Sequence, residues 1–509
     1  MTIIHTENLS PGSLSSDDTL QTYCGLDCCV TLEVLEELQR LHNQPPEIYQ
    51  FEKALQAPML EIMQRGFLVD SEGRQREAES LRRRISQLQL TLSEFAQAVW
   101  DRPLNPRSPK QLAEFFYQAL QLPEVWLSQK GERKLSTSRE ALEKLYEYLH
   151  ARPFVNCILA IRALAKQLDF FEIGIDSDGR FRTSYNIAGT ESGRLSSSEN
   201  AFGTGGNAQN VASYLRYVFI ADRGFKIGSI DLEQVEARDV GYFCGCLFDD
   251  WTYLDNCESG DLHTNNAKMV WPEKVTDRQS ADQIFYRDMT YRDMAKRGGH
   301  LTNYYGTAWT MSRHLKIPVA VAEGFQQRYC RGEKAVFPAI PKWWQWVAQQ
   351  LQTTRLLTTP FGRQRHFFGR PGDDTTLREA IAFLPQSTTA DRTNLGLWRI
   401  WRYMPQVQLL AQTHDSVTFQ FPDTGADEKF VEEALELMRV TLTSPHGRRY
   451  VVPGEAKVGW NWGPYSTEED VAKGRARRVN PEGLQKYKRG VPDQRVRQHL
   501  PAILDRRFV

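Results

Sequence analysis

The chain has 509 residues, of which 41% are apolar and 25% charged, as is typical of a globular protein with two to four domains. No apolar run approaches the ~20 residues of a membrane span, and residues 1–16 lack the basic and apolar segments of a signal peptide. We therefore expect a cytoplasmic protein that does not act in membranes. The formal net charge is zero, which excludes no nucleic-acid partner because phosphate contacts need only local basic surface.

The chain contains eight cysteines, without the paired spacing of a disulfide framework or a zinc site. Cys24, Cys28 and Cys29 form a cluster, but no His or Cys pair lies at ligand spacing. We interpret these three as reduced thiols in a hydrophobic core, and a metal site is the less favoured alternative.

Helices are predicted over much of the first third of the chain. Residues 18–41 have apolar side chains at helical spacing, among them Leu26, Val30, Leu35 and Leu38. A longer amphipathic helix is indicated where apolar residues recur every three or four positions opposite three arginines: Leu81, Ile85, Leu88, Leu92, Phe95 and Val99 against Arg82, Arg83 and Arg84. We expect the region from this helix to about Phe171 to be wholly helical.

An apolar run that changes into a charged run of helical spacing extends from Phe225 to Arg238. This pattern predicts a buried strand followed by a helix, with Asp231 at the junction. A carboxylate at the end of a core strand is held rigidly and faces open space, as metal-assisted chemistry requires. Asp231 could equally cap the following helix, and this alternative stays open.

A second candidate carboxylate lies in a predicted β-hairpin. Apolar and polar residues alternate over residues 407–421, and residues 413–416 suit a turn, which places Asp415 at the tip. If the two strands were neighbours, Asp231 and Asp415 could hold two Mg²⁺ ions about 3.5 to 4 Å apart. Such a pair activates an attacking hydroxyl and stabilises a leaving pyrophosphate.

Four residues spaced by four would share one face of a helix: Arg292, Lys296, His300 and Tyr304. Two cations one turn apart suit a triphosphate, and an aromatic ring farther along suits a base or a sugar. Gly298 and Gly299 weaken this helix, so that the pair either permits bending or ends the helix.

The C-terminal stretch from Lys473 to Arg507 is strongly basic, with eleven Lys or Arg against three Asp or Glu. A solvated tail and a surface that contacts phosphates have the same composition, so both interpretations stay open. The function of this stretch is not determined by the pattern.

Four sequence motifs carry a resemblance to a known family. In chain order they are Gly189-Thr-Glu-Ser-Gly-Arg-Leu-Ser-Ser-Ser198 with Gln209-Asn210, Asp231-Leu-Glu-Gln-Val-Glu-Ala-Arg238, Arg292-Asp-Met-Ala-Lys296 continuing to Tyr304-Tyr305-Gly306, and Gln412-Thr-His-Asp-Ser416. They resemble, respectively, the duplex-binding stretch and motifs A, B and C of the family A DNA polymerases, the DNA polymerase I family, in a short phage-like form. Because the motifs keep the family's order and the resemblance covers most of residues 46–465, chance is a poor explanation.

The resemblance implies an α+β right-hand polymerase fold with an antiparallel-sheet palm, a helical thumb and helical fingers. The boundaries that we predict are 1–45 for the stub of a 3′→5′ exonuclease domain, 46–175 for the palm entry and thumb, 176–245 for the first part of the palm with motif A, 246–375 for the fingers with motif B, 376–470 for the second part of the palm with motif C, and 471–509 for the basic tail. Tyr23 and Asp27 resemble the last exonuclease motif. Its partner carboxylates have no counterpart upstream, so we expect the remnant of a domain that is absent or encoded on another chain.

The resemblance also implies template-dependent DNA synthesis, in which the primer 3′-hydroxyl attacks the α-phosphate of a dNTP. Asp231 and Asp415, with Leu232 beside them, would hold two Mg²⁺ ions, and Lys296 would complete the catalytic set. Nucleotide binding is implied for Gln234, Glu236, His263, Arg292, Lys296, His300 and Tyr304. Within this set, Glu236 would exclude a ribose 2′-hydroxyl, and His300 stands where the family has Phe or Tyr beside the sugar. Either Tyr304 or Tyr305 fills the family's tyrosine position.

The implied partners are primer-template DNA and dNTPs, with a separately encoded exonuclease or processivity subunit as a further candidate. The residues implied to contact DNA are Arg194, Gln209, Asn210, Arg363, Gln386 and His414.

Two rival functions are considered. Asp231-Leu-Glu233 is also an Asp-x-Glu of the proofreading exonuclease type, although the Tyr23 and Asp27 motif ought then to lie downstream of it. A catalytically inactive DNA-binding scaffold is suggested by Ser416 and Ala382, which replace a Glu and an Asn of the family, and by the unusual His300. Because both aspartates and Lys296 are present, we favour an active polymerase.

Overall fold

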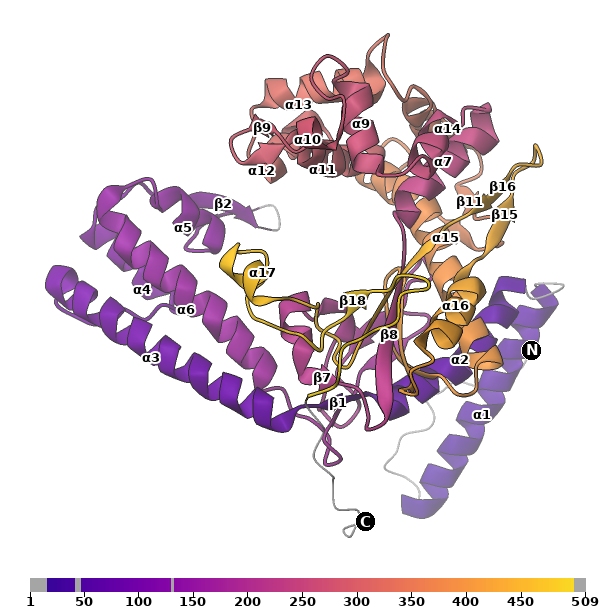
Figure 1. Cartoon of the computed structure of the whole chain (residues 1–509), viewed down its shortest axis with the longest axis horizontal. Helices are drawn as coiled ribbons and strands as arrows, with labels where there is room; N and C mark the ends of the chain where they lie inside the picture. The colour runs from indigo at the N-terminus through magenta and orange to yellow at the C-terminus, as the bar shows by residue number, and fades with distance from the viewer. Residues whose placement is uncertain (1–15, 42–46, 130–131, 499–509) are drawn as a thin grey trace.

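A computed structural model describes residues 16–41, 47–129 and 132–498. Figure 1 shows three bodies around a concave side, with the palm at the base, the thumb on one flank and the fingers opposite the thumb. This arrangement is the α+β right-hand fold that was expected. No helix within these three ranges combines the length and the apolar composition of a bilayer span.

The palm is built on a five-stranded antiparallel sheet in the order β13-β14-β8-β17-β18. The strands are β8 (Phe225–Leu232), β13 (Gln408–Thr413), β14 (Ser416–Pro422), β17 (Gly454–Gly459) and β18 (Gln485–Lys486). Because β8 is central, most of its residues are buried, whereas Asp231 near its end is exposed. Gly228 lies opposite Phe419, and a Cβ at Gly228 would come within 2.6 Å of the Phe419 ring. Glycine at this position therefore lets the ring cross the face of the sheet.

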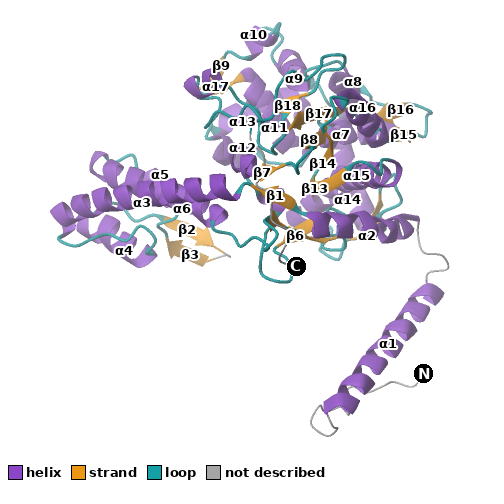
Figure 2. Cartoon of the chain, turned by 60° about the horizontal axis from the view of Figure 1, so that its bottom comes forward, coloured by secondary structure: helices purple, strands orange, loops and turns teal. Residues whose placement is uncertain are grey.

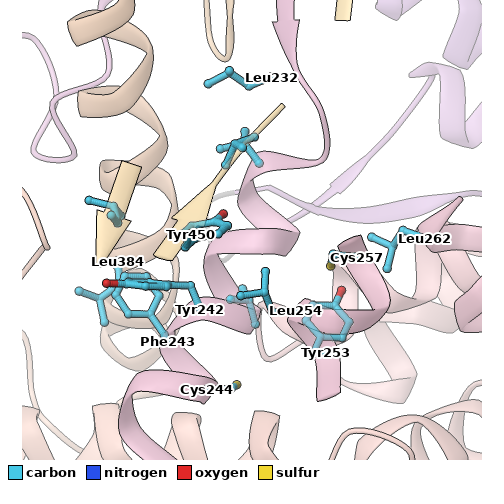
Figure 3. Packing of buried hydrophobic residues seen from close by; sticks show 14 of the residues in the cluster. Leu232, Tyr242, Phe243, Cys244, Tyr253, Leu254, Cys257, Leu262, Leu384 and Tyr450 are labelled. Carbon is cyan, nitrogen blue, oxygen red and sulfur yellow. The ribbon is translucent and has the colours of Figure 1, made fainter. Parts of the chain in front are cut away.

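Four helices pack against the palm sheet or against one another beside it. They are α2 (Glu47–Arg65), α7 (Val235–Phe248), α15 (Asp374–Tyr403) and α16 (Asp427–Met438). α2 and α15 contact β13, and α16 contacts β17. A small hairpin, β15 (Thr441–Thr443) and β16 (Arg449–Val451), adds Tyr450, whose ring stacks on Tyr242 of α7 at 4.9 Å between centroids. Figure 3 shows these rings within the buried cluster that joins the palm to the fingers.

The thumb and the palm are connected through a second small sheet. β1 (Phe67–Val69) lies between β4 (Arg180–Phe181) and β7 (Phe219–Ile220). The neighbouring segment contains the short pair β5 (Ser184–Asn186) and β6 (Ser196–Ser198), and the 3-10 turns η4 (Ala208–Asn210) and η5 (Ser213–Val218).

The thumb is dominated by two long helices that pack side by side, α3 (Ser71–Trp100) and α6 (Arg152–Phe171). Shorter helices complete it: α4 (Pro109–Ala113), which continues as a π-helical turn through residue 119, and α5 (Arg139–Leu145). The expectation that this region is wholly helical is wrong, because β2 (Trp126–Gln129) and β3 (Glu132–Leu135) form an antiparallel hairpin. Pro123 interrupts the helical pattern there, and the following Val125 and Trp126 favour extended backbone.

The fingers are helical with two small hairpins. The helices are α8 (Thr252–Glu258), α9 (Leu262–Val270), α10 (Arg278–Ala281), α11 (Tyr291–Asn303), α12 (Ala308–Leu315), α13 (Val319–Gln326), which continues as a π-helical turn through residue 331, and α14 (Ala339–Thr353). The hairpins pair β9 (Ile284–Tyr286) with β10 (Met289–Thr290), and β11 (Leu356–Thr358) with β12 (Gln364–His366).

The N-terminal helix α1 (Ser16–Leu41) confirms the helix predicted for residues 18–41. It lies apart from the three bodies (Figure 2), and Tyr23 and Asp27 on it are exposed. The interpretation of Cys24, Cys28 and Cys29 as core thiols is wrong, because all three are free and exposed. The apolar residues of α1 have no core to enter among the described residues, since Leu20, Leu32 and Leu38 are also exposed.

A fully buried ion pair ties α7 to α15 in the palm. Arg392 donates to Asp239 at 3.0 Å, and the same carboxylate accepts from the hydroxyls of Tyr450 and Thr389, each at 3.0 Å. Arg392 also donates to the carbonyl of Val440 at 2.8 Å. Removing one partner would leave an uncompensated charge in the core.

We therefore expect Asp239→Ala to lower the free energy of unfolding by about 3–5 kcal/mol. The matched control is Asp255→Ala, because Asp255 also pairs with an arginine, Arg448, but at the exposed surface. Such a pair contributes at most about 1 kcal/mol. Urea unfolding followed by tryptophan fluorescence measures the free energy of unfolding of both variants. An equal decrease in Asp239→Ala and Asp255→Ala would contradict the expectation.

Candidate active site

Asp231 lies where β8 ends and the chain turns into α7. In the turn, the amide of Glu233 donates to the carbonyl of Pro453 at 2.9 Å, and Gln234 has left-handed backbone with φ of 53°. Left-handed backbone raises the free energy of a residue with a Cβ, and it persists only where surrounding contacts stabilise it. The predicted strand-to-helix junction is confirmed, and Gln234 rather than Asp231 occupies the N-cap of α7.

The predicted hairpin is also confirmed, with Thr413 opposite Ser416 at the end of β13 and β14. His414 has left-handed backbone with φ of 56°, and Asp415 follows it in the turn. Ser416 lies opposite Asp231 on β8, and the amide of Leu232 donates to the carbonyl of Asp415 at 3.1 Å. The sheet register therefore brings Asp231 and Asp415 to the same end of two neighbouring strands.

The two carboxylates share a region in which the protein displaces part of their hydration. This loss of hydration, and then the charge of Asp415, raise the pKa of Asp231 to about 7. Loss of hydration likewise raises the pKa of Asp415. A divalent cation would neutralise both groups, so the pair favours metal binding.

The available donors fit Mg²⁺ rather than a softer metal. Within the described part of the chain, no three His, Cys, Asp or Glu side chains form a metal cage. The oxygen donors at this end of the sheet are the carboxylates of Asp231 and Asp415, next to which the amide of Leu232 donates to the carbonyl of Asp415. Mg²⁺ prefers such oxygen ligands and usually keeps several positions for water or substrate phosphate.

A cavity of about 320 Å³ opens beside these carboxylates, between α7, α9 and α11. Seven of the predicted site residues line it: Gln234, Glu236, His263, Lys296, His300, Tyr304 and Asp415. They come from segments that are far apart in the sequence. The cavity therefore brings Asp415 together with most of the side chains predicted to hold a nucleotide, and Asp231 lies at the neighbouring strand end.

The two cations predicted to meet a triphosphate have different environments. Arg292 donates from Nε and Nη2 to the two oxygens of Asp261, each at 3.0 Å, and does not line the cavity. Lys296 lines the cavity, is exposed and has no acidic partner among the described residues. Lys296 is thus the cation that is available to an anionic ligand.

Glu236, in the first turn of α7, is held from two sides. The hydroxyl of Tyr304 donates to Oε2 of Glu236 at 2.5 Å, and Arg194 pairs with Oε1. Burial, and then the charge of Glu236, raise the pKa of Tyr304 well above its usual value, so this hydroxyl stays a donor. Of the two tyrosines left open by the sequence, Tyr304 lines the cavity, whereas Tyr305 packs its ring on Trp344 at 5.3 Å.

Two histidines line the cavity. Burial, and then the charge of Lys296, lower the pKa of His263 to about 4, so its ring is neutral near pH 7. Nδ1 of His263 is buried without a hydrogen-bond partner in the described structure. His300 is exposed, and its ring lies edge-to-face on Tyr304 at 5.1 Å between centroids. Neither imidazole ring forms an ion pair with a carboxylate in the described part of the chain, so both rings can contact a ligand.

Gly298 and Gly299 do not end α11, which continues beyond them. A Cβ at Gly298 would lie 2.9 Å from the ring of Phe325, and one at Gly299 would lie 3.2 Å from the hydroxyl of Tyr329. The glycines therefore allow α13 and the turn after it to approach α11 closely. Close packing explains the pair without any bending of the helix.

Some residues predicted to contact DNA are held within the protein. Gln209 is buried, and its side-chain amide donates to Gln412 at 3.2 Å. Arg363 pairs with Asp391 at 2.7 Å and with Glu52 at 2.6 Å. Side chains held in this way have fewer donors left for a duplex. The other predicted contacts differ in exposure: Asn210 and His414 are exposed, Gln386 is half-buried on α15, and Arg194 is paired with Glu236.

Three residues of the site were not predicted. Asp261 holds Arg292 and is the N-cap of α9, and its place directly before a helical pattern is a signal that could have shown the cap. Asn303 and Tyr253 line the cavity and share a hydrogen bond of 2.8 Å. They are 50 residues apart, so no local pattern marks them as neighbours.

The family model for DNA polymerase family A matches residues 74–463, well over half of the chain. The chain belongs to DNA polymerase family A. Among its curated relatives, DNA polymerase I of Thermus caldophilus is 29% identical over 360 residues, which cover 66% of this chain and 39% of that protein. DNA polymerase I of Synechocystis is 24% identical over 471 residues, which cover 84% of this chain and 44% of that protein. This family A chain thus spans about two fifths of the length of these relatives.

A solved structure supports the same assignment of the fold. The polymerase domain of Pol1 from M. smegmatis, in complex with DNA primer-template and dNTP, superposes with a TM-score of 0.68 at 21% identity. The match covers 91% of this family A chain and 79% of that domain. At this identity the likeness confirms the right-hand fold.

Proposed function

We propose that this chain is a template-dependent DNA polymerase that adds dNTPs to a primer 3′ end in DNA replication. The observation that carries the proposal is the position of Asp231 and Asp415 at adjacent strand ends, beside a cavity that also presents Lys296. Membership of DNA polymerase family A supports it, as does the solved relative that contains primer-template and dNTP.

The proposed active site uses charge and position rather than a covalent intermediate. Two Mg²⁺ ions, held by Asp231, Asp415 and the backbone carbonyl of Leu232, would activate the primer 3′-hydroxyl and neutralise the departing pyrophosphate. Lys296, which lines the same cavity as Asp415, would pair with the triphosphate. Because charge develops on several phosphate oxygens in phosphoryl transfer, a fixed cation lowers the barrier without forming a bond.

Glu236 is proposed to select deoxyribose. Its carboxylate is fixed by Tyr304 and Arg194, so it cannot easily move aside for a larger sugar. A 2′-hydroxyl pressed against such a group would lose affinity through steric conflict. His300 and His263, which line the same cavity, are proposed to contact the sugar and the phosphates, respectively.

The nuclease alternative receives less support from the geometry. It requires Asp231 to act with Glu233, but the carboxylate whose charge raises the pKa of Asp231 most is that of Asp415, at the neighbouring strand end. The inactive-scaffold alternative is disfavoured because Lys296 lines the cavity without an acidic partner in the described structure. A separate exonuclease or processivity subunit remains a prediction.

Primer extension with dNTPs, with rNTPs and without nucleotide tests the proposed function. We expect template-directed elongation with dNTPs and Mg²⁺. Shortening of the primer without nucleotides would support the nuclease, and duplex binding without any change in length would support the scaffold.

We expect Glu236→Ala to raise the ratio of ribonucleotide to deoxyribonucleotide incorporation about 10- to 100-fold, because it removes the group that crowds a 2′-hydroxyl. Glu236→Gln is the matched control, since it keeps the volume of the side chain and removes its charge. We expect this control to retain most of the discrimination. Steady-state kcat/KM for one rNTP and the matching dNTP measures both variants, and an unchanged ratio in Glu236→Ala would place the sugar selection elsewhere.

A further inference from the structure

The described part of the basic C-terminal stretch is folded onto the palm. The family match ends at residue 463, and the chain then continues through α17 (Glu468–Ala472) and β18. β18 pairs with β17, and Arg495 donates to the carbonyls of Val458 and Gly483, each at 2.8 Å. Figure 1 shows this segment, in yellow, along the concave side between the thumb and the palm sheet.

The segment carries far more positive than negative charge. Between Lys473 and Arg497 there are nine Lys or Arg and two Asp or Glu. Some of the cations have acidic partners, as Arg478 does with Glu77 of α3 at 3.1 Å. Arg475 and Arg477 form no ion pair within the described residues. Their charge is therefore available to a ligand.

Arg475, Arg477 and Arg478 line a cavity of about 390 Å³ between this segment and η5. The guanidinium of Arg477 lies 3.8 Å from the ring centroid of Tyr214, and that of Arg478 lies 3.4 Å from the ring centroid of Tyr217. Stacking holds each guanidinium plane and leaves N–H donors at its edge, a geometry that suits phosphate oxygens.

One carboxylate also lines this cavity, that of Asp470. It accepts hydrogen bonds from the amide and the hydroxyl of Thr467 in the capping box of α17, at 3.0 and 2.8 Å. The carboxylate of Asp470 thus takes part in the N-terminal capping of α17. Three arginines against one carboxylate leave the cavity with a net positive charge.

We propose that Arg475 and Arg477 bind the phosphodiester backbone of the primer-template duplex beside the thumb, as an addition to the family A palm. This proposal rests on the proposed function. A duplex is favoured over a protein partner because the cavity presents the ring-stacked guanidinium of Arg477 beside that of Arg475, and neither forms an ion pair within the described residues. Charge of this kind fits a regular polyanion. The ion pair of Arg478 with Glu77 of α3 places Arg475 and Arg477 near the junction of thumb and palm.

The test compares Arg475→Ala/Arg477→Ala with Lys488→Ala/Arg489→Ala. The control removes the same charge from two exposed residues of the same segment, beside α16, where Arg489 approaches Glu432 at 3.9 Å. For the first variant we expect the Kd for primer-template to rise about tenfold, and the slope of log Kd against log salt to fall by about 2, since two phosphate contacts are lost. Single-nucleotide insertion at saturating DNA should not change, and the control should match the unmodified protein.

Fluorescence anisotropy with labelled primer-template gives Kd and the salt slope without any need for polymerase activity. A chain that binds DNA through these arginines but does not extend a primer would therefore contradict the proposed function and not this proposal. Arg475→Lys/Arg477→Lys keeps the charge and should keep the salt slope, which distinguishes lost phosphate contacts from misfolding. An unchanged Kd and slope in the alanine variant would overturn the proposal. Weaker binding of single-stranded DNA alone, or slower insertion at saturating DNA, would also overturn it.

Discussion

Replacing Asp231 or Asp415 with asparagine should reduce primer extension by at least about a thousandfold, because losing a metal ligand removes roughly 4 kcal/mol of transition-state stabilisation. Asparagine keeps the size of the side chain and its place at the strand end but supplies no negative charge. Since neither carboxylate is a phosphate contact, the Kd for primer-template should stay within about twofold. Single-turnover insertion and anisotropy measure the two quantities on the same samples.

Glu233→Gln is the matched control for these variants. Glu233 is two residues from Asp231 but, unlike Asp415, it neither lies at the neighbouring strand end nor lines the cavity, so the polymerase site predicts insertion within about threefold of the unmodified protein. A loss as large as that of Asp231→Asn would instead support the Asp-x-Glu nuclease pair. Near-normal extension by either aspartate variant would contradict the assignment of the active site.

Lys296→Ala should lower kcat/KM for dNTP about 100- to 1000-fold, the usual cost of removing one fixed donor that faces developing charge. The reason is that Lys296 is the cavity-lining cation without an acidic partner among the described residues. The Kd for primer-template should not change, because α11 approaches the nucleotide cavity. Arg297→Ala is the control, since Arg297 is adjacent, exposed and outside the cavity.

The variant Arg292→Ala distinguishes a role of Arg292 in binding the triphosphate from a role in stabilising the fold. Arg292 is held by both oxygens of Asp261, so we expect a smaller loss of kcat/KM than in Lys296→Ala and a clear loss of thermal stability. Kinetics and a melting curve on the two variants distinguish these effects. If Arg292→Ala caused the larger kinetic loss without lowering the Tm, the two cations would have the opposite roles.

The local elements around the active site were predictable from the sequence. The strand β8, the helix α7 and the hairpin of β13 and β14 follow from patterns of apolar and polar residues with periods of two or about 3.6 residues. The shared face of Lys296 and His300 follows from their spacing of four residues in a helix. These periods come from the backbone geometry of strands and helices, so a few neighbouring residues are enough to reveal them. The motifs were assigned by their resemblance to a known family, and the family match confirms that assignment.

Contacts between distant residues could not be predicted in this way. The sequence showed two cations on one helix face, but only the tertiary structure pairs Arg292 with Asp261 and leaves Lys296 open to the cavity. The basic composition after residue 473 did not distinguish a tail from a surface, and the pairing of β18 with β17 placed the described part on the palm. The cysteines of α1 had the composition of core residues, yet they are exposed.

The chain by itself thus determined which elements form and which chemical groups they carry. The folded structure decided which of those groups are buried, paired or free. The physical reason is that backbone hydrogen bonding within a helix or hairpin involves residues close in sequence, whereas desolvation and ion pairing depend on every atom nearby in space. At the active site those atoms come from the end of β8, from α7, α9 and α11, and from the β13–β14 hairpin, which meet only when the palm and the fingers pack together.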